Sequence, residues 1–264
     1  MKHIEPVPIP PICLIEHCFK YFKYHFCLTH EARKNELYRQ LYADIGFHEE
    51  KYLIMDNGAF ENGSSDVLAD IIEGIETMHP QEVILPDRMF MSDKTIEMTA
   101  DALRVLKPKY PGMNFQAVVQ GRNYHEILDC IQAYNYMGIS IIGVPKDYEA
   151  WPGGREVICS LIRGEYCPPF DVDMIHLLGM EKDVHTVRRW RNCNNIRSMD
   201  TAKPYIITAE NRNMFDCKIP RQKDYFYLSD KFFDDVILLH QNENYFRHLL
   251  SVSTPPVSKL YADL

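Results

Sequence analysis

Residues 52–60, YLIMDNGAF, decide the fold, because a short apolar run, typical of a buried strand, ends here in Asp56 and a turn-forming Asn-Gly pair. The same arrangement recurs along the chain, and a longer helical pattern separates most of these runs from the next. Short β-rich runs that alternate with helical patterns are typical of βα units and a parallel sheet.

Eight runs are expected to form strands, at Cys13–His17, His25–Thr29, Tyr52–Asp56, Glu82–Asp87, Phe115–Gly121, Ser140–Pro145, Asp173–Gly179 and Ile196–Asp200. Helical spacing of apolar residues predicts helices at about 31–44, 65–78, 92–107, 123–137, 151–163, 182–192 and 230–250. Eight strands favour an α/β fold of the (β/α)8 barrel type over a doubly wound open sheet, and the glycine-rich turn of dinucleotide folds is absent. We therefore expect one domain over residues 1–264, with the barrel at about 12–205 and an extension at about 206–264.

The composition is that of an ordinary globular protein, with 46% hydrophobic, 12% aromatic and 25% charged residues among 264. No apolar run is long enough for a membrane span, and the amino terminus lacks the features of a signal peptide, so we expect a cytoplasmic protein without a membrane partner. The eight cysteines are scattered without a Cys-x-x-Cys pair, which favours reduced core residues.

The net charge of −8 argues against a broad phosphate-binding surface. Positive charge nevertheless gathers in the last third of the chain, at Arg188, Arg189, Arg191, Arg197, Lys203, Arg212, Lys218, Arg221 and Lys223. A local nucleic-acid surface and a solvated helix face both explain such a cluster.

Four of the expected strands end in a polar residue, namely Asp56, Asp87, Gln120 and Asp200. A single aspartate in such a place is more often a cap or turn residue. Active sites of (β/α)8 barrels lie at the carboxyl ends of the strands, so four polar ends on one rim indicate a site.

The chemistry of these four side chains suits a nucleoside. Paired carboxylates such as Asp56 and Asp200 serve glycosyl transfer, in which one attacks the anomeric carbon and the other handles protons. Asp87 and Gln120 offer the acceptors and donors that match the guanine edge. Phe60 is placed either to stack on a flat base or to pack in the core.

The strand ends also form an ordered series of motifs. They are Asp56-Asn57-Gly58-Ala59-Phe60, Leu85-Pro86-Asp87, Val118-Val119-Gln120-Gly121, Ile142-Gly143-Val144-Pro145, His176-Leu177-Leu178-Gly179-Met180 and Ser198-Met199-Asp200-Thr201. In this order they resemble the queuine/archaeosine tRNA-guanine transglycosylases, and most of all the DpdA-type DNA-guanine transglycosylases of phages and bacteria. The resemblance covers roughly residues 50 to 205.

The resemblance implies that the chain exchanges guanine for a 7-deazaguanine in DNA by double displacement, as a pentosyltransferase without a cofactor. Asp200 would be the nucleophile and Asp56 the proton-handling carboxylate, while Gly143, Val144 and Gly179 would contact the base. The expected partners are nucleic acid, with DNA favoured over tRNA, and the deazaguanine base, in the host cytoplasm if the chain is phage-encoded. A tRNA enzyme and a non-catalytic nucleic-acid-binding subunit remain alternatives, and the oligomeric state stays open.

Two departures from that family matter. The chain lacks the Cys-x-Cys-x-x-Cys zinc motif, so we expect no zinc subdomain and no metal. Met214-Phe215-Asp216-Cys217 resembles the family's nucleophile segment more literally than Asp200 does, but Asp200 ends the eighth expected strand and is favoured over Asp216. A barrel glycoside hydrolase is disfavoured, because the chain has only two Trp residues for a sugar-binding cleft.

Overall fold

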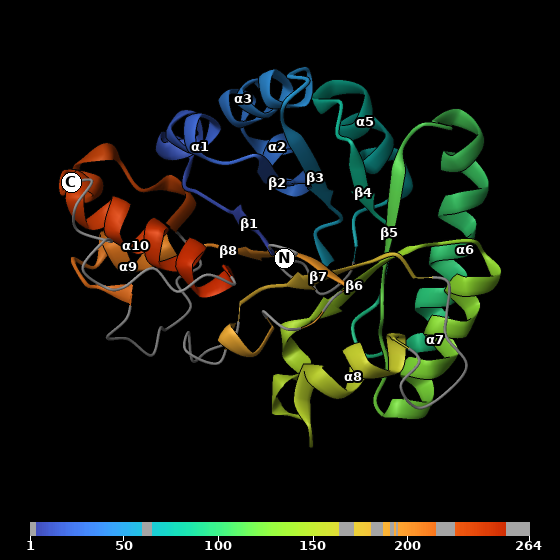
Figure 1. Ribbon diagram of the computed structural model, residues 1–264. Coiled ribbons are helices and arrows are strands. Elements are labelled where there is room, and N and C mark those ends of the chain that lie inside the picture. The colour runs from blue at the N-terminus through green and yellow to red at the C-terminus, as the bar shows by residue number, and fades with distance from the viewer. Residues whose placement is uncertain are drawn as a thin grey trace. The chain divides into compact units, whose positions relative to one another are not determined.

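A computed structural model describes residues 4–59, 65–163, 172–180, 187–190, 193, 195–214 and 225–251. Eight strands form one sheet in the order β1-β8-β7-β6-β5-β4-β3-β2. β1 pairs with β8, and β2 to β6 pair in chain order, all of them parallel. With helices around the strands, the fold is a (β/α)8 barrel, which confirms the fold class predicted from the sequence (Figure 1).

The strands are β1 Glu5–Pro8, β2 Tyr24–Leu28, β3 Tyr52–Asp56, β4 Glu82–Ile84, β5 Asn114–Val118, β6 Ile141–Pro145, β7 Met174–Leu178 and β8 Ile196–Thr201. The α-helices are α1 Ile15–Tyr21, α2 Thr29–Lys34, α3 Glu36–Gly46, α5 Leu68–Met78, α6 Ser92–Lys109, α7 Tyr124–Tyr136, α8 Gly154–Ile162, α9 Lys203–Ala209 and α10 Val236–Leu250. Short 3-10 helices are η1 Ile12–Leu14, η2 Lys146–Ala150, η5 Tyr225–Tyr227 and η6 Asp230–Phe233. In the described part of the chain, no helix has the length and apolar character needed to cross a bilayer. The helix predicted at 182–192 lies mostly outside the described residues.

The chain divides into two compact units. The larger unit is Lys23–Leu177, which contains β2 to β6 and most of β7. The smaller unit joins Met1–Phe22 to Leu178–Leu264, and its elements include β1, β8, α1, α9 and α10.

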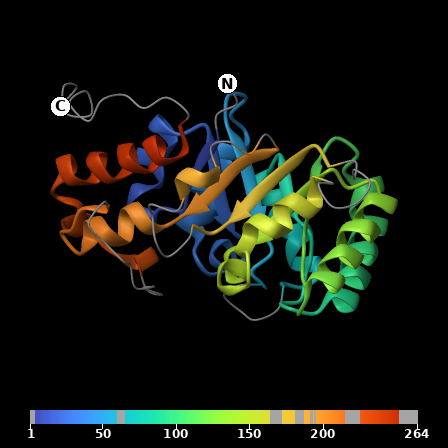
Figure 2. The same cartoon turned by 60° about the horizontal axis from the view of Figure 1, so that its bottom comes forward.

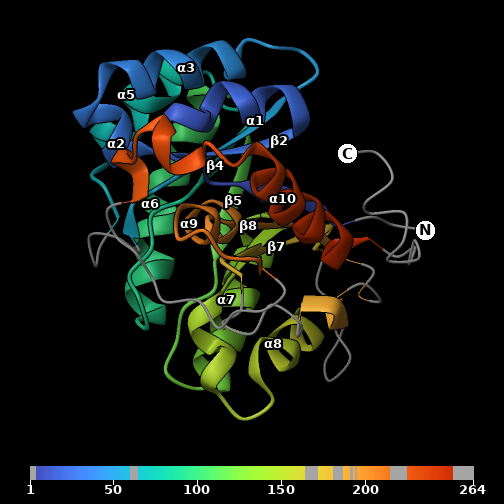
Figure 3. The same ribbon diagram turned by 90° about the vertical axis from the view of Figure 1, so that its left-hand side faces the viewer.

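Strands β3 to β7 have one face that is apolar. Met55 of β3 shows that this face packs against α5. A Cβ built on Gly74 of α5 would lie 2.8 Å from the Met55 sulfur. The helices lie outside the strands (Figure 1), and α3 and α5 lie side by side (Figure 3). Ten residues of this face are fully buried: Leu53, Met55, Val83, Leu85, Ala117, Val119, Ile142, Val144, Ile175 and Leu177.

Asparagine caps set where two helices of this unit begin. Asn123 accepts a hydrogen bond from the Glu126 main-chain N–H at 3.0 Å and starts α7, within the helix predicted at about 123–137. Asn35 accepts from the Tyr38 main-chain N–H at 3.0 Å and starts α3. This second cap divides the single helix predicted at 31–44 into α2 and α3.

The smaller unit packs α9 against α10, which lie side by side in Figure 2. β1 runs beside β8 in a register that brings Val7 opposite Asp200. A separate apolar cluster ties α1 to these helices, and its buried members are Leu14, Cys18, Phe22, Tyr205, Phe233 and Leu239.

The prediction of a first strand at Cys13–His17 is wrong, because these residues form η1 and the start of α1. The strand is Glu5–Pro8, whose prolines lack the N–H groups that strands normally donate. Pro6 and Pro8 occupy alternate positions, so both missing donors face away from β8. The Ile9 N–H, on the paired side, donates to the Thr201 carbonyl at 3.0 Å.

We predict that Gly46→Ala destabilises the protein. An alanine Cβ at this position would lie 1.8 Å from the Met78 carbonyl oxygen, and main-chain atoms at the end of α5 cannot move aside as a side chain can. Overpacking of this kind should lower the free energy of unfolding by about 2 kcal/mol or more in urea denaturation. The matched control is Gly112→Ala, since a Cβ there meets no atom within 4 Å. Equal stability of the two variants would contradict this packing.

Candidate active site

Three neighbouring strands of the larger unit bring polar side chains together at their carboxyl ends. Asp56 is the last residue of β3, Asp87 follows β4, and Gln120 follows β5. Parallel neighbours end on the same edge of a sheet, so these residues lie at the edge where (β/α)8 barrels carry their chemistry. Asp87 and Gln120 are in direct contact, as their shared strand-end position suggested.

Asp87 is the centre of this group. Its Oδ1 accepts a hydrogen bond from Asn57 Nδ2 at 2.7 Å, and its Oδ2 accepts one from Gln120 Nε2 at 2.6 Å. All three side chains are buried, and Asp87 is 3% exposed. A buried carboxylate is therefore held by one amide on each side.

The main chain fixes the orientation of both amides. Gln120 Oε1 accepts from the Phe90 N–H at 2.8 Å, so its NH2 group must turn toward Asp87. Asn57 Oδ1 accepts from the Ala59 N–H at 2.9 Å, and Asn57 Nδ2 also donates to the Leu85 carbonyl at 2.7 Å. Because a main-chain N–H can only donate, Asp87 always faces two donors.

Burial raises the pKa of Asp87 from 3.8 to about 6, although the hydrogen bonds from Asn57 and Gln120 oppose this rise by favouring the ionised form. A carboxyl group with a pKa near 6 exchanges protons readily close to neutral pH. This is the range in which a general acid or base works best.

Asp56 differs from Asp87 in its exposure. Its side chain is half-buried, and its Oδ2 accepts a hydrogen bond from the Gly58 N–H at 3.0 Å. Gly58 has φ of 73°, a left-handed conformation that glycine adopts without strain. The Thr29 hydroxyl donates to the main-chain carbonyl of Asp56 and helps to hold this turn. Asp56 is thus the more accessible carboxylate of this rim.

Asp200 and Gly179 belong to the smaller unit. The Gly179 N–H donates to Asp200 Oδ1 at 2.9 Å, and Asp200 is 5% exposed. The pairing of Asp200 with Asp56 stays a prediction. Phe60 and Asp216 lie outside the described residues.

Gly143 and Val144 lie on β6 and use their carbonyls within the protein. The Gly143 carbonyl accepts from the Val119 N–H at 3.1 Å, and the Val144 carbonyl accepts from Arg155 Nη2 at 2.6 Å. Each carbonyl thus has a partner within the protein, and a role of these two residues in substrate binding stays a prediction.

Two members of the group were not identified from the sequence. Asn57 directly follows Asp56, so its position at a strand end was an available signal. Tyr148, in η2, carried no such signal. Its buried hydroxyl accepts from the Gly121 N–H at 2.9 Å and lies 3.2 Å from Gln120 Oε1, and burial raises its pKa. Tyr148 therefore completes the contacts around Gln120.

A pocket of about 370 Å³ lies at the other end of these strands, where it is lined by Tyr52, Pro80, Gln81, Tyr110, Pro111, Gly112, Met113 and Asn114. These are the amino ends of β3 and β5 and their neighbouring turns. Barrel enzymes carry their chemistry at the opposite, carboxyl ends. We therefore assign the candidate active site to the Asp87 group and not to this pocket.

Among the described residues, one group of side chains has the spacing of a metal site: His17, His240 and Glu243 of the smaller unit. None of them was a candidate from the sequence. The group shares no residue with the Asp87 group.

No known protein family and no curated protein matches the sequence. Several solved structures are similar to the chain. The YdjI aldolase of Escherichia coli has a TM-score of 0.53 at 10% identity, over 94% of this chain and 88% of that one. An HpcH/HpaI aldolase/citrate lyase family protein of Burkholderia cenocepacia has a TM-score of 0.53 at 8% identity, over 80% and 92%. 2,3-Dimethylmalate lyase, of the PEP mutase/isocitrate lyase superfamily, has a TM-score of 0.52 at 11% identity, over 92% of both chains.

Identities this low establish the barrel fold alone, but these neighbours contradict the guanine transglycosylase prediction. The similar structures are aldolases and lyases, so the predicted family, the pentosyltransferase activity on DNA or tRNA, and the nucleic-acid and deazaguanine partners are wrong. The physical reason lies in the motifs, because apolar strands with polar ends are common to (β/α)8 barrels. Asp87 and Gln120, expected to read guanine, bind each other instead.

We predict that Asp87 gives the protein a pH-dependent stability. Its pKa of about 6 in the folded state exceeds the ordinary value of 3.8, so the folded state holds this proton more tightly. The contribution of Asp87 to the free energy of unfolding should be fully present below pH 4 and lost as pH rises to about 6. The difference is on the order of 3 kcal/mol.

Urea denaturation from pH 4 to 7 measures this effect. Asp87→Asn should remove the decline between pH 4 and 6, apart from a constant offset for the altered hydrogen bonds. Asp101→Asn, at an exposed position of α6, is the control and should keep the decline. If the profile of Asp87→Asn still matched that of the unmodified protein, the raised pKa of Asp87 would be wrong.

Proposed function

We propose that the chain is a lyase of the aldolase type that breaks or forms a carbon–carbon bond in a small hydroxy acid. The observation that carries this proposal is the buried carboxylate of Asp87, held by Asn57 and Gln120 with a pKa near 6. The names of the similar aldolases and lyases support the reaction class, and a small molecule replaces nucleic acid as the expected partner.

Aldol cleavage needs a base at the substrate hydroxyl. The base removes the hydroxyl proton, the C–O bond becomes C=O, and the carbon–carbon bond breaks. The electron pair of that bond moves to the carbon next to the carboxylate or carbonyl group, and this carbon then takes up a proton. One acid–base group of suitable pKa can serve both proton transfers.

Asp87 is the proposed base, and its two amide donors hold the carboxylate in one orientation. Asp56 is the proposed substrate-binding carboxylate, because it is the more accessible of the two. The role of Asp200 stays a prediction from the sequence. A cytoplasmic location is also part of this proposal.

NMR of the full chain with a panel of small hydroxy acids in D2O, with and without Mg²⁺, tests this function. We predict cleavage of one of these acids, with deuterium incorporated at the carbon that carried the broken bond. The rate should fall below pH 6, where Asp87 is protonated. Asp87→Asn should lower kcat at least 100-fold, which is the usual loss when a general base is removed.

Asp101→Asn is again the matched control and should retain full activity. The absence of both cleavage and deuterium exchange with every acid of the panel would contradict the proposed reaction class. Cleavage that survives Asp87→Asn unchanged would leave the reaction class standing and reject Asp87 as its base.

A further inference from the structure

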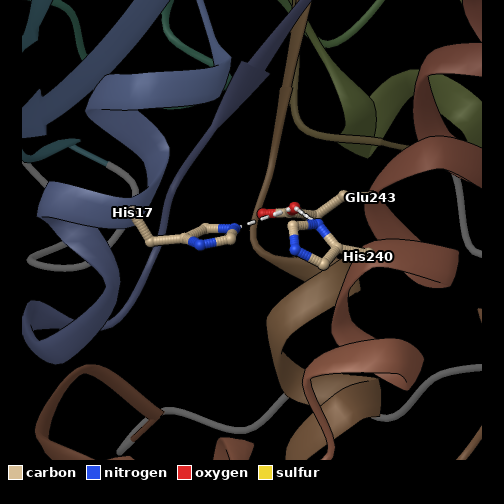
Figure 4. A group of neighbouring side chains, drawn as sticks. All are labelled: His17, His240 and Glu243. Carbon is tan, nitrogen blue, oxygen red and sulfur yellow. Dashed lines mark hydrogen bonds and ion pairs between the residues drawn. The ribbon is translucent and has the colours of Figure 1, made fainter. Parts of the chain in front are cut away.

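We propose that His17, His240 and Glu243 bind one divalent transition metal ion, for which Zn²⁺ is the best match. The three side chains converge from two helices of the smaller unit (Figure 4). They share no residue with the proposed lyase site, so this inference is independent of the proposed function.

Helical spacing brings two of the ligands to one face of α10. His240 and Glu243 are three positions apart, which places neighbouring side chains on the same side of a helix. His17 reaches them from α1. Glu243 Oε2 lies 3.0 Å from His17 Nε2 and 3.7 Å from His240 Nδ1.

The distances fit a common ion. One ligand atom from each residue lies within 4.8 Å of the other two. Zinc binds imidazole nitrogen and carboxylate oxygen at about 2.0–2.2 Å, so tetrahedral ligand atoms lie a little over 3 Å apart. The 3.0 Å distance from Glu243 Oε2 to His17 Nε2 is close to that spacing, and the 3.7 Å distance to His240 Nδ1 exceeds it only slightly.

The charge distribution favours a cation. Glu243 is 1% exposed, and within the described residues its Oε1 is buried without a hydrogen-bond partner. A buried carboxylate oxygen without a donor is costly, and a metal ion satisfies it directly. Two imidazoles add nitrogen ligand atoms, and this set of ligands suits Zn²⁺ better than Mg²⁺ or Ca²⁺.

An ion pair between His17 and Glu243 is the simpler explanation. It accounts for the 3.0 Å contact, but not for His240, whose Nδ1 points toward the same carboxylate (Figure 4). The three rings of His17, Tyr21 and His240 also pack together, with centroids 4.8 to 5.4 Å apart, which limits the rotation of both imidazoles. The ligands are thus already oriented.

Solvent can reach this group from one side. The side chain of His17 is 19% exposed and that of His240 is 26% exposed, while Glu243 forms the buried wall. Three protein ligands with solvent access leave the fourth position of a tetrahedral ion to water. Such an ion would join α1 to α10, helices from opposite ends of the sequence.

Isothermal titration of the full chain with Zn²⁺ tests the site, using untagged protein that has been freed of metal with a chelator. We expect one ion per chain and a rise in Tm when Zn²⁺ is added, because the ion binds only the folded protein. His240→Gln should weaken Zn²⁺ binding at least tenfold and abolish the rise in Tm. His125→Gln, at an exposed histidine of α7, should change neither.

Glu243→Gln provides a second test, because it keeps the shape of the side chain and removes the charge. It should weaken Zn²⁺ binding as His240→Gln does, and His240→Gln alone decides the matter if Glu243→Gln fails to fold. Absence of Zn²⁺ binding by the unmodified protein would overturn the proposal. So would equal affinity of His240→Gln and His125→Gln, which would indicate adventitious binding to surface histidines.

Discussion

The organisation of the larger unit follows from one constraint: each parallel strand must cover one face with a helix. On β3 to β7 that face is apolar, as Met55 against Gly74 illustrates, and most of its side chains are fully buried. The requirement weakens where the strand ends, because the residues beyond it no longer belong to the apolar face. Polar residues such as Asp56 and Gln120 are therefore tolerated there, and the barrel gains a site for chemistry without loss of its core.

The properties of Asp87 are a consequence of this arrangement. Its neighbours Asn57 and Gln120 come from adjacent strand ends, and main-chain groups fix the direction of both amides. Hydrogen bonds alone would lower the pKa of the carboxyl group, whereas burial raises it, and burial has the larger effect. Burial of Asp87 therefore determines its proton affinity more than its hydrogen-bonding neighbours do.

Much of the fold could be predicted from the sequence, because apolar periodicity directly reports which face of an element is covered. Apolar periodicity failed to predict the strand at Glu5–Pro8, because its prolines are untypical of strands and its main-chain N–H groups point only toward β8. It also failed at Asn35, where a cap divides one helical pattern into two helices. The contact between Asp87 and Gln120 could be anticipated, because both residues follow the ends of neighbouring strands. Tyr148 was missed because its side chain comes from a 3-10 helix, whose path no local pattern determines.

Function was harder to predict, because residue type does not specify what a side chain binds. Asp87 and Gln120 carry the groups that recognise guanine, yet the structure turns these groups toward each other. For His17 and Glu243 the sequence contained no indication of a contact, because the two residues are far apart along the chain. Only the packing of α1 near α10 makes them partners. Both cases show that the presence of a chemical group in the sequence does not determine whether that group is available to bind a ligand. Availability depends on tertiary contacts, and so a series of strand-end motifs identifies a barrel more securely than it identifies a substrate.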